Sequence, residues 1–363
     1  MNQADFERTF KLPFNEASTW FRDKLNIPTA KWDELSAAGH AKGFASAGAY
    51  QADLLTELRQ MTDKAIAGGM DIREFRKQFR PLVDKYGWQL QGGGPAWRSD
   101  LIFRTNIQCA YQAGRWQQFQ TAGTEYLKYL HNDGVMHPRP NHLAMNGITL
   151  PITDPFWSVN YPVNGFGCKC RAVAATKAEY KATPAALRTR PENWRDLPDK
   201  GWAYNVGDTS RGYRALTEKF EHMPNDIARA WMQRWVNEPV FERFIAGKIA
   251  EDFPVAVLKP KDMAALASGR QTVWMSAETL SDHLDKHPEI GIDEYRRIPT
   301  ILDEGEVYRQ GDERLVYLKR DGKLYRAAIK RTRSGDDNYF LTLFTTSEET
   351  AYRDVVRKYE RIR

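Results

Sequence analysis

The feature that most constrains the fold is a change in the spacing of apolar residues along the chain. Through the first half, apolar side chains recur at helical intervals, and the longest such run extends from Trp97 to about Thr121. In the last hundred residues, apolar and polar side chains alternate instead, which is typical of strands. We therefore expect a multidomain protein with a mostly α N-terminal part and a C-terminal α+β module.

The alternating segments of the last hundred residues predict an antiparallel sheet. They are Glu306–Arg309, Arg314–Arg320, Leu324–Lys330 and Tyr339–Thr345. Asp321 and Gly322 separate the second from the third, and this dipeptide favours a tight hairpin because both residues tolerate positive φ. Ser276 can cap a short helix that runs to about His287, since serine is a preferred N-cap.

The length of 363 residues is sufficient for more than one hydrophobic core. Pro, Arg, Thr and Gly are frequent from 176 to 214, which is typical of a connecting segment, and helical spacing then returns to about residue 250. We expect three parts: a helical domain over 1–175, a helical connector over 176–255 and an α+β module over 256–363.

The bulk composition excludes some classes of protein. No apolar run approaches the roughly 20 residues that a membrane-spanning helix needs. The start of the chain lacks the basic and apolar pattern of a secretory leader, so we expect a protein that stays in the cytoplasm where it is made. The net charge of +6 favours an anionic partner only weakly, because much of it can lie on a solvated surface.

Four side chains of the types that bind Zn²⁺ lie between residues 137 and 170. They are His137, His142, Cys168 and Cys170. Structural zinc sites usually place paired cysteines two to four residues apart, whereas these two are separated by a single residue. Three interpretations stay open: a structural zinc site, small buried residues in a loop-rich cap, and a cysteine nucleophile paired with His142. The three cysteines of the chain do not make a disulfide framework.

Several of these motifs, in this order, resemble the phage Mu F-like head morphogenesis family. The family commonly has an Arg-Thr pair, an Ala and a Gly on one helix, as Arg104–Arg115 has here. Arg139-Pro140-Asn141-His142 matches its Arg-x-x-His. Cys168-Lys169-Cys170 matches its Cys-Arg-Cys except at the centre, where lysine keeps the charge and loses the planar guanidinium. The resemblance covers roughly residues 10–175.

This resemblance implies a minor head protein of a tailed phage or prophage. Such a protein is made in the bacterial cytoplasm and assembled in several copies into the virion, at the portal or the inner capsid surface. The implied partners are the portal protein, the major capsid protein or both, with packaged DNA or host RNA as further partners. No cofactor is required for that role, and a structural zinc is the one that the residues suggest.

The last hundred residues resemble phage-encoded modules of the barnase/EndoU/colicin/RelE-like RNase superfamily. Metal-independent RNA cleavage needs a base, an acid and cations around one phosphate. The predicted catalytic residues are His283, His287, Lys330 and Thr345. The predicted nucleic-acid contacts are the hairpin cations Lys319, Arg320, Lys323, Arg326, Arg331 and Arg333. If the chain is ejected with the DNA, such a module is a delivered effector.

Two alternatives to the RNase remain open. Histidines four residues apart and a basic hairpin fit a solvated or docking surface equally well, in a purely structural head protein that binds portal or DNA without catalysis. The second alternative is a polymorphic toxin that uses a Mu F-like domain for delivery. Fold-level analogy does not decide between them.

Overall fold

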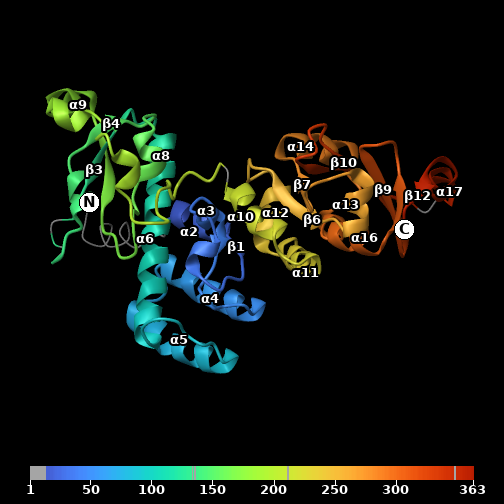
Figure 1. Cartoon of the computed structure of the whole chain (residues 1–363), viewed down its shortest axis with the longest axis horizontal. Helices are drawn as coiled ribbons and strands as arrows, with labels where there is room; N and C mark the ends of the chain where they lie inside the picture. The colour runs from blue at the N-terminus through green and yellow to red at the C-terminus, as the bar shows by residue number, and fades with distance from the viewer. Residues whose placement is uncertain (1–13, 133, 135, 211, 347–348) are drawn as a thin grey trace, which may run out of the picture. The chain divides into compact units, whose positions relative to one another are not determined.

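The structure is a computed structural model that describes residues 14–132, 134, 136–210, 212–346 and 349–363 (Figure 1). The chain divides into two compact units, Met1–Gly212 and Tyr213–Arg363. Within the described ranges, no helix is both long and apolar enough to cross a membrane.

The N-terminal unit is built on one long helix, α6 (Pro95–Thr121), which confirms the helix expected from Trp97 to about Thr121. Pro95 stands in its first turn, where the missing N–H has no helical acceptor to lose. The other helices are α2 (Asn15–Arg22), α3 (Gly39–Lys42), α4 (Ala52–Ile66), α5 (Ile72–Tyr86), α7 (Pro140–Ala144), α8 (Phe156–Asn160) and α9 (Lys177–Ala182). Three short 3-10 helices are η1 (Trp32–Glu34), η2 (Ala185–Arg188) and η3 (Trp194–Asp196).

Helices α2, α4 and α5 contact α6. The closest approach is at Gly114, where an added Cβ would lie 2.7 Å from the Phe14 ring and 2.8 Å from the Ala17 backbone nitrogen. The glycine of the Mu F-like pattern is therefore required for α2 to pack on α6. Helix α5 begins at Asp71, whose carboxylate accepts from the backbone N–H of Arg73 at 2.8 Å and forms its N-cap.

Two small sheets complete this unit. Strands β1 (Leu25–Asn26) and β2 (Gly43–Phe44) form a parallel pair. Strands β3 (Tyr126–Leu130), β4 (Thr149–Pro151) and β5 (Arg171–Ala175) form an antiparallel sheet in the order β4-β3-β5. Leu127 and Tyr129 of the central strand are fully buried, so one face of this sheet lies in the core.

The two compact units differ from the expected division into 1–175, 176–255 and 256–363. Residues 176–212 belong to the N-terminal unit, where the Asn160 side-chain amide donates to the Trp194 carbonyl at 2.8 Å. The helices of the expected connector after residue 212 belong to the C-terminal unit, since α11 (Asn225–Trp235) packs on strand β6 (Phe253–Val257). Neither the surface-like composition of residues 176–214 nor the helical spacing that follows revealed which hydrophobic core each segment covers.

The C-terminal unit is an α+β module around a seven-stranded sheet. The strand order is β12-β8-β9-β10-β11-β7-β6, and all neighbours are antiparallel except β11 and β7. The strands besides β6 are β7 (Thr272–Met275), β8 (Glu306–Arg309), β9 (Arg314–Asp321), β10 (Lys323–Arg331), β11 (Asn338–Thr346) and β12 (Glu360–Arg361). The helices besides α11 are α10 (Gly212–Glu221), α12 (Pro239–Ile245), α13 (Pro260–Leu266), α14 (Ala277–Lys286), α15 (Ile292–Tyr295), α16 (Ile298–Glu304) and α17 (Glu349–Lys358).

The four expected strands correspond to β8, β9, β10 and β11, within about one residue at each end. The hairpin at Asp321-Gly322 is confirmed, although only Gly322 has positive φ (71°), because Asp321 pairs directly with Lys323. Ser276 caps α14, as its hydroxyl accepts from the Thr279 N–H at 3.4 Å. Strands β6 and β7, which the alternation did not reveal, are almost fully buried on both faces.

Candidate metal centre

His142, Cys168 and Cys170 meet in the interior of the N-terminal unit. Their side chains are buried, with 2%, 5% and 3% of the residue surface exposed. One ligand atom from each lies within 4.8 Å of the other two, and Cys170 Sγ is 3.9 Å from His142 Nδ1. A tetrahedral zinc with Zn–S near 2.3 Å and Zn–N near 2.0 Å needs donors roughly 3.5–4 Å apart. The cluster is thus close to the spacing that zinc requires.

Local structure brings these three residues together. Pro140 starts the short helix α7, which presents His142. The two cysteines follow a turn in which the Cys168 N–H donates to the Gly165 carbonyl at 3.1 Å, and β5 begins directly after Cys170. Arg139 links the two segments, because its guanidinium donates to the Phe166 carbonyl at 2.6 Å. The Arg-x-x-His and Cys-x-Cys motifs therefore form one site.

Asp199 completes the surroundings of the histidine. Its Oδ1 lies 3.4 Å from His142 Nε2, and its Oδ2 lies 3.5 Å from Arg139 Nε. The Nε2 contact is not aligned as a hydrogen bond, so this buried nitrogen has no hydrogen-bond partner among the described residues. A carboxylate beside the outer nitrogen of a histidine is the usual arrangement around metal-binding imidazoles, since it favours the tautomer whose other nitrogen can bind the metal.

The two thiols titrate as a coupled pair. The hydrogen bond from Cys168, helped by one from Tyr129, lowers the pKa of Cys170 to about 7. The pKa of Cys168 is raised well above its usual value, first by its bond to Cys170 and then by burial. One sulfur is therefore available as a thiolate near neutral pH, and the thiolate is the form that binds metal.

His137 does not belong to this cluster. It is exposed before α7, and of the four predicted ligands the structure brings together only His142, Cys168 and Cys170. Asp199 was not identified from the sequence, because it lies far along the chain, in a segment without a recognisable metal motif. Only the fold shows that the segment around Trp194 and Asp199 returns to this side of the unit.

A cysteine nucleophile is the other chemistry that this arrangement suggests. Cys170, His142 and Asp199 follow one another in space as a nucleophile, a base and an orienting acid do. A nucleophile must touch its substrate, however, and Cys170 is 3% exposed. The burial favours a structural site over a catalytic one.

Comparison with known proteins identifies the region that contains this cluster. Residues 56–173 match the family model of Phage Mu protein F like protein. This region is Mu F-like. The chain is 28% identical over 253 residues to the protein F of Escherichia phage Mu, which is named for capsid assembly. That alignment covers 57% of this chain and 57% of the relative. The chain is also 35% identical over 177 residues to the Mu-like prophage FluMu F protein of Haemophilus influenzae. That alignment covers 45% of this chain and 41% of the relative.

The chain thus spans about half the length of the curated relatives it matches. No solved structure matches it. His142, Cys168 and Cys170 all lie inside the matched region, whereas Asp199 and the entire C-terminal unit lie outside it.

The predicted catalytic histidines lie in the C-terminal unit, on and just after α14 and beside β11. His283 has both ring nitrogens engaged: Nδ1 is 2.6 Å from the Tyr295 hydroxyl, and Nε2 accepts from the Leu343 N–H at 3.1 Å. Burial, followed by the neighbouring His287, lowers the pKa of His283 to about 4. His287 is more open, with Nδ1 3.3 Å from Glu289. This geometry gives His283 the role of a neutral crosslink between α14 and β11.

Lys330 and Thr345 are not brought to one phosphate. Lys330 pairs with Tyr339 at one end of β11, and Thr345 lies near the other end. The six residue-to-residue steps from Tyr339 to Thr345 span about 20 Å at roughly 3.3 Å per step. The four predicted catalytic residues therefore do not form a single constellation, and their catalytic role stays a prediction.

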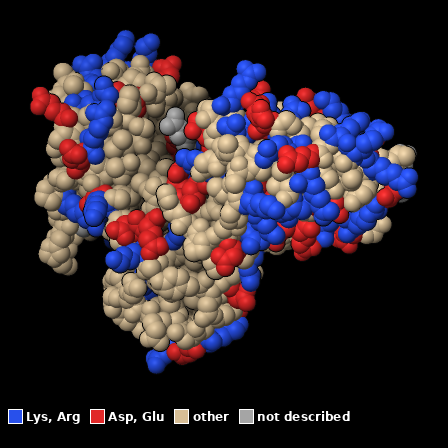
Figure 2. Space-filling view, turned by 45° about the vertical axis from the view of Figure 1, so that its right-hand side comes forward, with Lys and Arg blue, Asp and Glu red and all other residues tan. Residues whose placement is uncertain are grey.

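The predicted nucleic-acid contacts lie on a surface of mixed charge. Lysines and arginines are dense over the C-terminal unit, with acidic side chains between them (Figure 2). Three of the six are paired with carboxylates: Lys319 with Glu304 at 2.7 Å, Arg320 with Glu349 at 2.7 Å and Lys323 with Glu294 at 3.2 Å. The other three, Arg326, Arg331 and Arg333, form no ion pair with a described carboxylate, and Arg326 lies over the Phe344 ring. Pairing reduces the positive potential that a phosphate backbone would meet.

Proposed function

We propose that this chain is a head morphogenesis protein of a tailed phage or prophage, a minor capsid component present in several copies in the virion. The observation that carries the proposal is the Mu F-like match over residues 56–173, together with a relative named for capsid assembly. The proposed site of action is the portal vertex or the inner capsid surface, with the portal or major capsid protein as the partner.

Within that role, the N-terminal unit carries a structural zinc. The support is a buried cluster of two thiols and an imidazole, with Asp199 beside the outer ring nitrogen. His142 Nδ1, Cys168 Sγ and Cys170 Sγ are the proposed ligands, and a water molecule or an exogenous donor would take the fourth position. Zinc in this place would tie α7 to the start of β5 and so stabilise the loop-rich side of the unit.

For the C-terminal unit we favour the structural alternative over the RNase. His283 is held on both nitrogens, Lys330 is remote from Thr345, and half of the hairpin cations are paired with acids. We propose that this surface docks onto the portal, the capsid protein or packaged DNA. A metal-independent RNase ejected with the DNA remains the competing function, and the assay below separates the two.

The assembly role is tested in the phage or prophage that encodes the chain. A gene deletion should stop production of filled heads, and the wild-type chain supplied in trans should restore them and be found in purified particles. Normal particles in the deletion, or restored particles that lack the chain, would contradict the proposal. The polymorphic toxin would show the second pattern, because it acts outside the virion.

The zinc site is tested by metal analysis of the purified full chain. We expect about one zinc per chain in the wild type, and loss of that zinc in His142→Ala and Cys168→Ser. His137→Ala is the matched control, because it removes an exposed histidine from the same motif but outside the cluster. Equal zinc in His142→Ala and His137→Ala would exclude the site, as would a stable wild-type chain without metal after expression in zinc-supplemented medium.

The two functions of the C-terminal unit are separated by incubating the full chain with several RNAs, including tRNA, in EDTA. The structural alternative predicts no cleavage and, if DNA is the partner, salt-dependent binding without turnover. Cleavage that disappears in Lys330→Ala but persists in Arg333→Ala would establish the RNase instead.

A further inference from the structure

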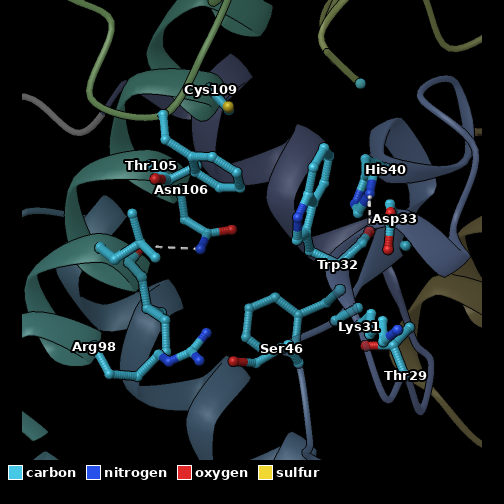
Figure 3. A pocket seen from close by; sticks show the side chains of 18 of the residues that line it. Thr29, Lys31, Trp32, Asp33, His40, Ser46, Arg98, Thr105, Asn106 and Cys109 are labelled. Carbon is cyan, nitrogen blue, oxygen red and sulfur yellow. Dashed lines mark hydrogen bonds between the residues drawn. The ribbon is translucent and has the colours of Figure 1, made fainter. Parts of the chain in front are cut away.

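The N-terminal unit contains a second site, a pocket of about 560 Å³ that is separate from the metal cluster. Its walls come from the segment between α2 and β2, from the first half of α6, and from the loop at Gly201–Tyr204 (Figure 3). Pockets of roughly 300–1,000 Å³ are the size that holds small ligands. Several wall residues, among them Lys31, Asp33 and Trp97, are exposed, so the pocket opens to solvent.

Four tryptophans give this pocket flat apolar walls. They are Trp20, Trp32, Trp97 and Trp202. The wall is closely built at Gly201, which has a φ of +83°, because a Cβ there would lie 2.3 Å from the Trp32 ring. Aromatic faces of this kind pack against rings and extended apolar groups.

A buried cation lies in the same pocket. Arg98, in the first turns of α6, is only 7% exposed, and burial lowers its pKa. One terminal nitrogen donates to the Gln91 carbonyl at 2.5 Å, and the guanidinium carbon lies 5.3 Å from the centre of the Trp97 ring, while Nε has no hydrogen-bond partner among the described residues. No carboxylate within the described ranges forms an ion pair with Arg98, although a buried charge normally has such a partner. Figure 3 shows its guanidinium directed from α6 towards the side where Ser46 lies.

Other polar atoms of residues in the pocket wall are also buried and have no hydrogen-bond partner in the part of the chain that the structure describes. They are the indole nitrogens of Trp20 and Trp202 and the hydroxyls of Thr29, Ser46 and Thr105. Buried polar groups are normally hydrogen-bonded, because an unmet donor costs roughly 1–3 kcal/mol. Five such groups lie in the wall of one cavity, in addition to Arg98 Nε, but none of these atoms is exposed to the open volume, so an occupant would meet the rest of the Arg98 guanidinium instead.

The charge of the wall indicates the sign of that occupant. Lys31 and Arg98 are cationic wall residues, and Asp33 is the single acid among the described residues that line the pocket. Lys31 and Asp33 are exposed, whereas Arg98 is buried. The buried part of the wall therefore carries the positive charge of Arg98 and no negative charge.

We propose that this pocket binds a carboxylate attached to an aromatic or other apolar body. The carboxylate would accept from the Arg98 guanidinium, whose planar fork matches a planar carboxylate. The apolar body would lie between the tryptophans. Two sources share this chemistry: a free aromatic acid, and the last residue of a polypeptide chain, which carries its carboxylate next to its side chain. The proposal does not depend on the assembly role.

The test uses the full chain and two pairs of probes, in which a carboxylate is compared with the uncharged primary amide of the same body. The first pair is 3-phenylpropionate and its amide, and the second is N-acetyl-phenylalanine and its amide. We expect each acid to bind at least about tenfold more tightly than its amide, a difference of 1.4 kcal/mol, measured by calorimetry. Equal binding of acid and amide, or no saturable binding of either acid, would overturn the proposal and leave a pocket that holds only water.

Two variants locate the binding. Arg98→Met should abolish the preference for the acid, while Arg104→Met, which removes an exposed arginine from the same helix, should leave it unchanged. If Arg98→Met fails to fold, Trp97→Ala serves instead, because Trp97 is 49% exposed and its loss should weaken acid and amide alike. An acid preference that survives Arg98→Met would overturn the assignment. Tighter binding of the acetylated amino acid than of phenylpropionate would identify a chain end as the source, and the reverse order a free acid.

Discussion

Lys24 offers the sharpest test of the electrostatics of the N-terminal unit. The residue is 3% exposed, and its ammonium group donates to the carbonyls of His40 and Ala41, the latter at 3.1 Å, and lies 4.0 Å from the centre of the Trp20 ring. Burial lowers the pKa of Lys24 from 10.5 to about 7, and the nearby Lys42 adds to this effect. The folded protein therefore carries a lysine that loses its proton near neutrality.

The sign and size of the effect on stability follow from this pKa. Between about pH 7 and 10.5 the unfolded chain keeps the proton on Lys24 while the folded chain releases it. Because the unfolded state then binds more protons, stability rises with pH in this window, by about 1.4 kcal/mol per pH unit. The difference of about 3.5 in pKa amounts to roughly 5 kcal/mol over the whole window. As the pH falls to 7 and below, this stability is lost.

The measurement compares the free energy of unfolding of the wild type with that of Lys24→Met at pH 7, 8, 9 and 10. Methionine cannot titrate, and the loss of donors to the carbonyls is the same at every pH, so only the slope of the difference matters. We expect the wild type to gain about 1.4 kcal/mol per pH unit relative to the variant. Lys64→Met, which removes an exposed lysine, controls for the loss of one charge. Parallel curves for the wild type and Lys24→Met would refute the reasoning and show that the carbonyls keep the buried ammonium charged.

Three further changes have defined outcomes. Arg363→Ala should destabilise the C-terminal unit by roughly 3–5 kcal/mol, because it strands the fully buried Asp262 carboxylate that Arg363 holds at 2.9 and 3.0 Å; an unchanged melting temperature would contradict this. Burial depresses the pKa of His283 to about 4, so its contribution to stability is present above pH 6.5 and is lost as the pH falls towards 4, and His283→Phe should flatten that part of the pH–stability curve. Gly201→Ala should lower the melting temperature by forcing a left-handed alanine against the Trp32 ring, at a cost of about 1–3 kcal/mol; wild-type melting would show that the ring moves freely.

Much of the secondary structure was predictable because its signals are local. The period of α6 and the glycine of the hairpin lie within a few residues of the elements that they determine. The paired cysteines and His142 could also be identified, since their side-chain types carry the chemistry themselves.

The features that the sequence did not reveal depend on contacts between residues that are far apart in the chain. His137 and His142 are the same residue type in one motif, and only tertiary packing buries one of them and exposes the other. Nothing in the sequence around Asp199 or Arg98 marks either residue as part of a site. From the sequence alone, a carboxylate and a guanidinium at these positions are expected to be ordinary surface charges. The boundary between the units was misplaced for the same reason, since a helix does not encode which core it covers.

Gly114 lets α2 pack closely against α6, because it has no side chain at the point of contact. A Cβ at this position would meet the Phe14 ring and the Ala17 backbone. Any larger residue would therefore displace the backbone of α2 and not only one side chain. Trp20 lies on α2 and Lys24 lies two residues after its end, and both line the pocket that contains Arg98. Gly114 does not line the pocket. A substitution of Gly114 would nevertheless change the width of the pocket that we propose as a binding site, because it would move α2.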